Sequence, residues 1–197
     1  MGAVVNGQSW VDQVEVRKQQ LDDPELRAMC DTFIRHVKTE WVGDLDATFA
    51  TMVPDPVYRN WGGFTNRSGP VEHHLEAIRA IYGTPVDRFG HYPPADMDIE
   101  RFLVSRDAIV MDGQIRMMSY GADLRALGED VDDATWYVVT TRIALFFPFR
   151  DGLMTGEDAY IDHLATIDEM SASDVERSWY RDDRAATNRA QGEESSP

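Results

Sequence analysis

Apolar residues recur every three or four positions between residues 24 and 52, which is the spacing of one face of an α-helix. Pro24 stands where a helix tolerates proline, in its first turn. Gly43 interrupts the pattern, and Asp44 directly after it can cap a new helix. The pattern therefore predicts two consecutive helices. Their shared apolar stripe consists of Leu26, Met29, Cys30, Phe33, Ile34, Val37, Trp41, Leu45, Phe49 and Met52.

The next part of the chain predicts a short strand and a further helix. Pro54 and Pro56 exclude a helix, and residues 57–61 then predict a short strand. A helix is expected from about Ser68 to Tyr82, with apolar residues again three or four apart. Two shorter helices are predicted outside this region, one beginning at Ser9 and one after Ser171.

From Asp98 onward the apolar period changes from helical spacing to alternation, which is typical of β-strands. Four strands are expected, over about 99–106, 108–120, 135–147 and 152–162. Asp151-Gly152 predicts a tight hairpin turn between the last two. The strand over 135–147 is apolar on both faces, which predicts a place in the middle of the sheet. The fold class is therefore α+β.

The chain length of 197 residues suits one domain with a sizeable core. We expect that domain over residues 24–170. An extension of residues 1–23 precedes it, and a helix with a polar, disordered acidic tail (171–197) follows.

Charge and cysteine content exclude several classes of function. The chain has 35 acidic and 19 basic residues, a net charge of −16, which disfavours nucleic acids and anionic membranes. A single cysteine, Cys30, excludes an internal disulfide and a cysteine-based metal site. It lies on the apolar stripe and is expected in the core. We find no signal peptide, apolar span or metal-ligand spacing, so the expected location is the cytoplasm, with no metal.

Three stretches of the sequence resemble the nuclear transport factor 2-like superfamily, over roughly residues 25–165. The stretches are Trp61-Gly62, Ile109-Val110-Met111-Asp112-Gly113, and Phe149 to Glu157 leading into Tyr160-Ile161-Asp162. The superfamily includes SnoaL-like polyketide cyclases, ketosteroid isomerases, limonene epoxide hydrolases, scytalone dehydratase and non-catalytic members. The resemblance implies a curved antiparallel (mixed) sheet that forms a cone, helices packed on one face, and a homodimer. A shared scaffold does not determine the chemistry.

The catalytic patterns of these families match the sequence only in part. Ketosteroid isomerases need a carboxylate on the first strand, where this chain has Asn60 and Trp61. The tyrosine and asparagine of limonene epoxide hydrolases match Tyr58 and Asn60. The charged residues that those hydrolases also use fall, without gaps, near Gly113, Ile115 and Ala159. The histidines and tyrosines of scytalone dehydratase have possible counterparts in His74, His91, Tyr58 and Tyr120.

Five residues are candidate acid/base groups. Glu157 shares strand parity with Leu153 and Ala159, which aims its carboxylate at an apolar face, where burial would raise its pKa. The alternative for Glu157 is a rim position paired with an arginine. Asp112 and Asp162 are each suited to the single pocket aspartate of SnoaL-like cyclases, or else to a turn and a helix cap respectively. The last two candidates are His74, on a helical apolar face, and His91, in a loop that could cover a pocket.

A second set of residues is suited to substrate binding. Tyr58 and Asn60 can orient an oxygen atom, and Trp61 can form an apolar wall. Tyr120 is a further pocket candidate. Arg142 is alone in an apolar strand and needs a partner, either a structural carboxylate or an anionic substrate.

The sequence therefore predicts a cofactor-independent enzyme that transfers protons on a small, largely apolar molecule. Polyketide-, terpenoid- or steroid-like compounds fit this description, and cyclisation, dehydration or isomerisation fits the chemistry. Two alternatives remain: a non-catalytic ligand-binding or dimerising module, and an epoxide-type hydrolase.

Overall fold

The computed structural model describes residues 4–62, 66–83 and 95–179 of the chain. His91 and the C-terminal tail lie outside these residues. In chain order the elements are α1 (Gly7–Lys18), α2 (Pro24–Val42), α3 (Leu45–Phe49), β1 (Met52–Gly62), β2 (Asn66–His74), α4 (Leu75–Gly83), β3 (Ala95–Val104), β4 (Ala108–Tyr120), α5 (Gly121–Ala126), β5 (Trp136–Arg150), β6 (Leu153–Glu169) and α6 (Ala172–Trp179).

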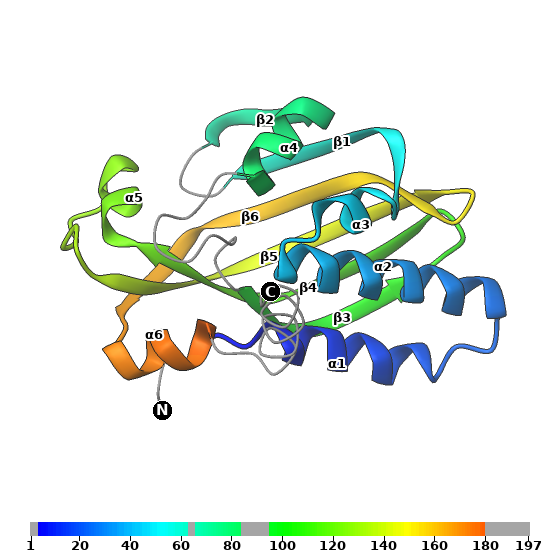
Figure 1. Ribbon diagram of the computed structural model, residues 1–197, viewed down its shortest axis with the longest axis horizontal. Coiled ribbons are helices and arrows are strands. Elements are labelled where there is room, and N and C mark those ends of the chain that lie inside the picture. The colour runs from blue at the N-terminus through cyan, green and yellow to red at the C-terminus, as the bar shows by residue number, and fades with distance from the viewer. Residues whose placement is uncertain (1–3, 63–65, 84–94, 180–197) are drawn as a thin grey trace, which may run out of the picture.

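The six described strands form one curved, unclosed sheet in the order β2-β1-β6-β5-β4-β3. Strand β1 runs parallel to β6, and every other neighbouring pair is antiparallel. Helices α1, α2 and α3 lie across one face of this sheet, while α5 and α6 lie at one end of the long strands (Figure 1). The predicted fold class, a mixed curved sheet with helices on one face, is confirmed.

The hydrophobic core lies between that sheet face and the helices. The ring centroid of Phe33, on α2, is 4.7 Å from that of Phe147, on β5, and both side chains are buried. Cys30 is buried in the same cluster, as predicted. Each fully buried large apolar side chain contributes roughly 1.5–3 kcal/mol relative to an exposed one. The apolar stripe predicted from the sequence therefore supplies the side chains that the helices contribute to the core.

The break between the first two predicted helices is confirmed. Gly43 ends α2 with a φ of 75°, a conformation that glycine adopts at little cost. Asp44 caps α3, because its side chain accepts a hydrogen bond from the Ala47 backbone N–H at 3.1 Å.

The helix expected from Ser68 is partly wrong, because the chain forms strand β2 up to His74 and only then α4. Pro70 is compatible with β2, since this strand lies at the edge of the sheet, where one row of backbone N–H groups needs no partner. Strand β1 is longer than expected and includes Pro54 and Pro56. Both prolines lie at an irregularity between Met52 and Val57, where the ladder with β6 is interrupted.

Strands β5 and β6 also extend beyond their predicted ends. Asp151 and Gly152 form the predicted turn between them, with positive φ values of 53° and 78°. Strand β5 is buried on both faces only over residues 136–139, and Phe146 on its outer face is 37% exposed. The outer face of this half of the sheet is therefore only partly covered.

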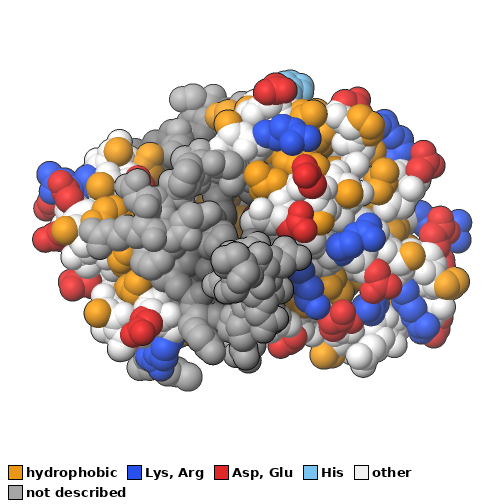
Figure 2. All heavy atoms as spheres, in the orientation of Figure 1, with side chains coloured by type: hydrophobic (Ala, Val, Ile, Leu, Met, Phe, Trp, Pro, Cys, Tyr) orange, Lys and Arg blue, Asp and Glu red, His pale blue; other side chains and the backbone are white. Residues whose placement is uncertain are grey.

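The N-terminal residues contribute to the core, although the sequence suggested an extension. Val11 and Val14 of α1 are buried, and α1 packs beside β3 and α2. Acidic and basic side chains intermingle over the helices in Figure 2. Lys18, for example, lies 2.7 Å from Asp31. No helix among the described residues is long and apolar enough to cross a membrane.

Candidate functional site

A cavity of about 210 Å³ lies between the inner sheet face and helices α1, α2 and α4. Most of its wall is apolar. The apolar lining residues are Trp10, Ile78, Ala95, Ile115, Met117, Ile143, Leu145, Ala159 and Ile161. Four polar side chains, those of Glu40, Tyr58, Asn60 and Glu157, complete the described lining. An apolar pocket with a few polar groups is the usual form of a small-molecule site.

Two neighbouring strands bring three of the polar residues to the same place. Tyr58 on β1 is the register partner of Glu157 on β6, and Asn60 is the partner of Ala159. Alternate residues of a strand point to the same face, and neighbouring strands lie about 4.8 Å apart. The side chains of Tyr58, Asn60 and Glu157 therefore share the inner face.

Gly156 makes this arrangement possible. A Cβ atom at this position would lie 1.8 Å from the Val57 backbone oxygen, so only glycine allows β1 and β6 to approach. Its φ of 154° also lies outside the range that other residues usually adopt. Gly156 directly precedes Glu157, so its close contact with Val57 determines the position of the Glu157 side chain in the cavity.

Glu157 carries a perturbed carboxyl group in this cavity. Burial among apolar atoms, with a smaller contribution from neighbouring Asp158, raises the pKa of Glu157 to about 7. The side chain keeps some accessible surface because it faces the cavity, but protein surrounds it. Within the described part of the chain, its carboxylate forms no hydrogen bond or ion pair. Burial therefore raises the pKa of Glu157, as the sequence analysis expected. Arg142 is not the partner of Glu157, because it pairs with Glu100.

Tyr58 is connected to a buried histidine that the sequence analysis missed. His36 on α2 is 1% exposed; its Nε2 atom lies 3.3 Å from the Tyr58 hydroxyl, and its Nδ1 atom lies 2.7 Å from Thr51 Oγ1. Burial lowers the pKa of His36 to about 4, so the imidazole is neutral near pH 7. Glu40 follows one turn later on α2, with Oε2 3.9 Å from His36 Nε2.

A signal for both missed residues was present in the sequence. Met29, Phe33, His36 and Glu40 are spaced by four, three and four, so the two polar residues continue the apolar stripe of α2. Polar residues on a buried stripe need hydrogen-bond partners and are therefore informative.

Asp112 and Arg142 do not reach the cavity. Both lie on the outer sheet face, where Asp112 pairs with Arg101 and Arg142 pairs with Glu100 at 2.7 Å. The Arg101 guanidinium holds the pKa of Asp112 below its usual value. Alternation along β4 and β5 explains the placement, since both residues have the parity opposite to the cavity-lining residues. The partner that Arg142 was predicted to need is Glu100.

Trp61 and Tyr120 are also absent from the described lining. Trp61 follows Asn60 and thus points to the outer face, where it stacks on Tyr160 with ring centroids 4.4 Å apart. Tyr120 ends β4 and packs against Trp136 in a separate cluster, with centroids 5.1 Å apart. The predicted apolar wall is formed by other residues.

The two remaining described candidates lie outside the cavity wall. Asp162 does not close a strand or cap a helix, because β6 continues to Glu169; its backbone oxygen accepts a hydrogen bond from Thr141 Oγ1 at 3.0 Å, beside a register shift. His74 is the last residue of β2 and is exposed, because the helical stripe on which it was placed does not exist there.

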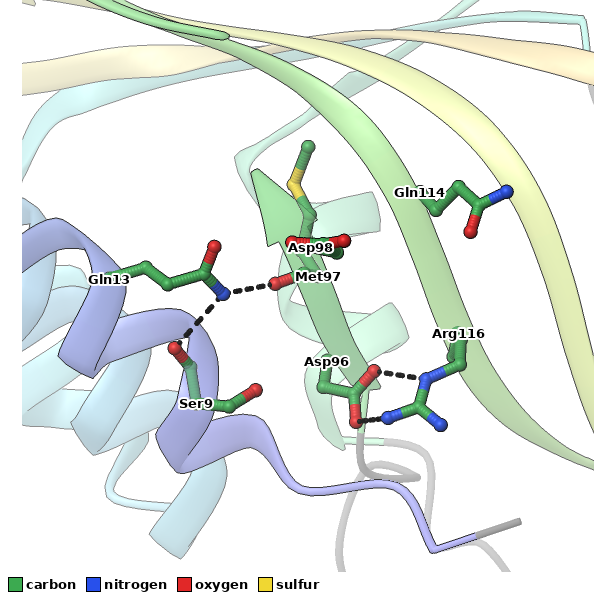
Figure 3. Close-up of a pocket in the computed structure, with 7 residues that line it drawn as sticks. All are labelled: Ser9, Gln13, Asp96, Met97, Asp98, Gln114 and Arg116. Atoms are coloured by element: carbon green, nitrogen blue, oxygen red, sulfur yellow. Dashed lines mark hydrogen bonds and ion pairs between the residues drawn. The ribbon is translucent and has the colours of Figure 1, made fainter. Parts of the chain in front are cut away.

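A second hollow, of about 430 Å³, lies beside α1 and the edge strand β3 (Figure 3). Its most buried charge, Asp96, already forms two hydrogen bonds with Arg116, at 2.8 and 2.6 Å. Gln13 is bound to the Met97 backbone oxygen at 2.7 Å. Although this hollow is larger, its buried polar groups bind one another, and we place the candidate site in the apolar cavity.

The mixed sheet, the helices on one face and the partly open cavity between them define a cone-shaped α+β protein. No protein-family model and no curated protein matches the chain. Solved structures are similar to the chain. One of them is Bal32a from a soil-derived mobile gene cassette, which has 16% sequence identity and a TM-score of 0.48. The match covers 70% of this chain and 91% of that one.

Two further similar structures carry names that suggest activities of their own. One is a candidate SnoaL-like polyketide cyclase from Jannaschia sp. CCS1, with 17% identity and a TM-score of 0.49, covering 72% of this chain and 90% of that one. The other is an LEH-like epoxide hydrolase of M. tuberculosis, with 16% identity and a TM-score of 0.46, covering 84% and 99%. These neighbours are of the kind named by the sequence resemblance.

Proposed function

We propose that this chain is a cofactor-independent enzyme that transfers a proton on a small, largely apolar molecule, with Glu157 as the general acid/base. The supporting observation is the position of Glu157. Its carboxyl group lies in an apolar cavity beside Tyr58 and has no counter-charge within the described residues. Cyclisation, dehydration and isomerisation are the reaction types that this arrangement suits.

The chemistry follows from the properties of the polar lining. A general acid/base works best when its pKa lies near the working pH, and burial brings the pKa of Glu157 to about 7. Tyr58 and Asn60 lie on the neighbouring strand and can orient an oxygen atom of the substrate by hydrogen bonding. The apolar wall excludes water, which strengthens both interactions.

The size and charge of the cavity narrow the substrate class. An engineered cavity of about 150 Å³ binds benzene, whereas pockets for drug-sized ligands have roughly 300–1,000 Å³. A cavity of about 210 Å³ therefore favours compounds with one or two rings over steroid-sized molecules. The described lining contains two glutamates and no lysine or arginine, which disfavours an anionic substrate.

The same cavity also suits a binding module without catalysis, and an epoxide-type hydrolase is a third possibility. Tyr58, Asn60 and Glu157 share one wall and are suited to holding a water molecule. However, Ile115 and Ala159 line the cavity at positions where the sequence comparison placed charged residues of limonene epoxide hydrolases. This difference favours proton transfer over epoxide opening.

A turnover screen tests the proposal. Purified protein is incubated with one- and two-ring polyketide- and terpenoid-like compounds, and products are detected by mass spectrometry. We expect Glu157→Gln to lower turnover by about 10²-fold or more, since glutamine cannot exchange the proton. Asp112→Asn, on the outer face, serves as the matched carboxylate control and should retain activity. Ligand-induced thermal stabilisation without turnover in any variant would instead support the binding module.

A further inference from the structure

Helix α1 supplies the largest described side chain of the apolar cavity, the indole of Trp10. The other described lining residues come from α2, α4 and the strands β1, β3, β4, β5 and β6. Helix α1 precedes residue 25, where the stretch that resembles the superfamily begins. One wall of the cavity therefore comes from a segment that the sequence analysis placed outside the domain.

The Trp10 ring is held in place by two fully buried neighbours. Its Nε1 atom lies 3.2 Å from Met111 Sδ, to which it donates a hydrogen bond. The ring centroid lies 5.9 Å from that of Phe33, with the two planes tilted by 59°. The indole N–H is the single polar group of this side chain, and it is used in the bond to sulfur. The ring is therefore a fixed apolar wall rather than a hydrogen-bonding group.

Helix α1 is attached to the edge strand β3 by residues other than Trp10. The Gln13 side chain donates to the Met97 backbone oxygen at 2.7 Å (Figure 3) and accepts from the Ile99 N–H at 3.0 Å. Arg17 donates to the Ile99 oxygen at 2.6 Å. Neither Gln13 nor Arg17 belongs to the described lining of the apolar cavity. The attachment of the helix and the shape of the cavity can therefore be changed separately.

We propose that Trp10 is a specificity-determining residue whose indole sets the upper size limit of the ligand. This inference rests on the proposed function, because it assumes that the substrate occupies the same cavity. The indole is itself a pair of fused rings, so its removal would free a space of about the size of a two-ring compound. Apolar cavities of this kind accept apolar guests. Trp10 thus restricts a cavity of about 210 Å³ to compounds with one or two rings and excludes larger ones.

Two neutral probes of different size test the proposal. Calorimetry measures the binding of 2-naphthol, which has two rings, and fluorescence measures that of N-phenyl-1-naphthylamine, which has three. We expect Trp10→Ala to bind the three-ring probe about tenfold more tightly than the wild type and 2-naphthol more weakly, because contacts with the indole are lost. Trp10→Phe should lie between the two. An unchanged ratio of the two dissociation constants, or no binding of 2-naphthol to the wild type, would overturn the proposal.

Gln13→Ala provides the matched control on the same helix. It weakens the attachment of α1 to β3 and leaves the described lining intact, so the ratio of the two dissociation constants should stay as in the wild type. An equal gain for the three-ring probe in Gln13→Ala would mean that a loosened helix, rather than the missing ring, admits the larger ligand. Circular dichroism checks that each variant is folded. If Trp10→Ala unfolds, Trp10→Phe carries the test, because it keeps an aromatic ring beside Phe33.

The two proposals can fail separately. If the ratio is unchanged in the Trp10 variants while Glu157→Gln still abolishes turnover, the role of Trp10 is wrong and that of Glu157 stands. If Trp10→Ala gains the three-ring probe but Glu157→Gln leaves turnover unchanged, the acid/base assignment is wrong and the size limit set by Trp10 stands.

Discussion

Tyr58 and Glu157 are register partners across β1 and β6, the single parallel pair among the described strands. In a parallel pair both side chains leave the sheet on the same face, so a phenol and a carboxyl group lie side by side. The tyrosine is further bound to buried His36. The chemistry proposed for the cavity therefore depends on strand register as much as on residue type.

The stability of the protein should depend on pH through Glu157. Its pKa is raised to about 7 in the folded state, above the ordinary value of 4.5, so the folded protein binds the proton more tightly than the unfolded chain. The free energy of unfolding should therefore fall as the pH rises from about 4.5 to about 7, by up to about 3 kcal/mol. Urea unfolding at pH 4.5 and pH 8 measures this loss.

Glu157→Gln provides the comparison for that experiment. Glutamine is neutral at both pH values, so the variant should be more stable than the wild type at pH 8 and close to it at pH 4.5. Equal pH dependence in the two proteins would show that Glu157 does not carry a raised pKa.

Filling the cavity should block ligand binding without unfolding the protein. Ala159 is 3% exposed and lines the cavity, so Ala159→Leu adds three carbon atoms to a space of about 210 Å³. We expect ligand-induced thermal shifts to disappear, while the melting temperature of the free protein stays the same or rises. Tyr160→Leu, at the next position on the opposite face, should leave ligand binding intact. Retained binding in Ala159→Leu would place the ligand elsewhere.

The sequence predicts periodic elements well because periodicity is a local property. The α2 stripe, the Gly43 break and the Asp151-Gly152 turn are correctly predicted, since each depends on residues within a few positions. Strand β2 was predicted to be part of a helix because the few apolar residues of this short segment, which contains Pro70, also fit helical spacing. Its pairing with the preceding strand β1, from Gly62 with Asn66 to Val57 with His74, settles the choice.

The site was predicted only in part, because local patterns do not show which residues the fold brings together. Glu157 was chosen from strand parity, which is local, and Tyr58 and Asn60 from their match to the tyrosine and asparagine of limonene epoxide hydrolases. Asp112 and Arg142 were assigned to the pocket because parity alone does not say which face of β4 and β5 is covered. His36 and Glu40 continue the apolar stripe of α2, but only the tertiary packing of this helix shows that His36 reaches Tyr58.

Gln13 should protect the exposed edge of the sheet. Its side-chain amide donates to the Met97 oxygen at 2.7 Å and accepts from the Ile99 N–H at 3.0 Å, which replaces the pairing that a further strand would supply to β3. Gln13→Ala should lower the free energy of unfolding by about 1–3 kcal/mol. Amide hydrogen exchange should show faster exchange at Ile99 N–H. The exposed residue Gln20 offers a control, because Gln20→Ala should change neither quantity, and unchanged exchange in Gln13→Ala would contradict the protective role.

Two glycines close together in sequence should respond very differently to alanine. At Gly156 the new Cβ would lie 1.8 Å from the Val57 oxygen, so β1 and β6 would have to separate. At Gly152 no atom lies within 4 Å, and only the left-handed backbone, with φ of 78°, is unfavourable. We expect Gly152→Ala to cost about 1–2 kcal/mol in urea unfolding. Gly156→Ala should cost more and should also displace Glu157, with a loss of turnover that Gly152→Ala does not show. Similar costs and similar turnover in the two variants would show that the close approach at Gly156 does not position the carboxyl group.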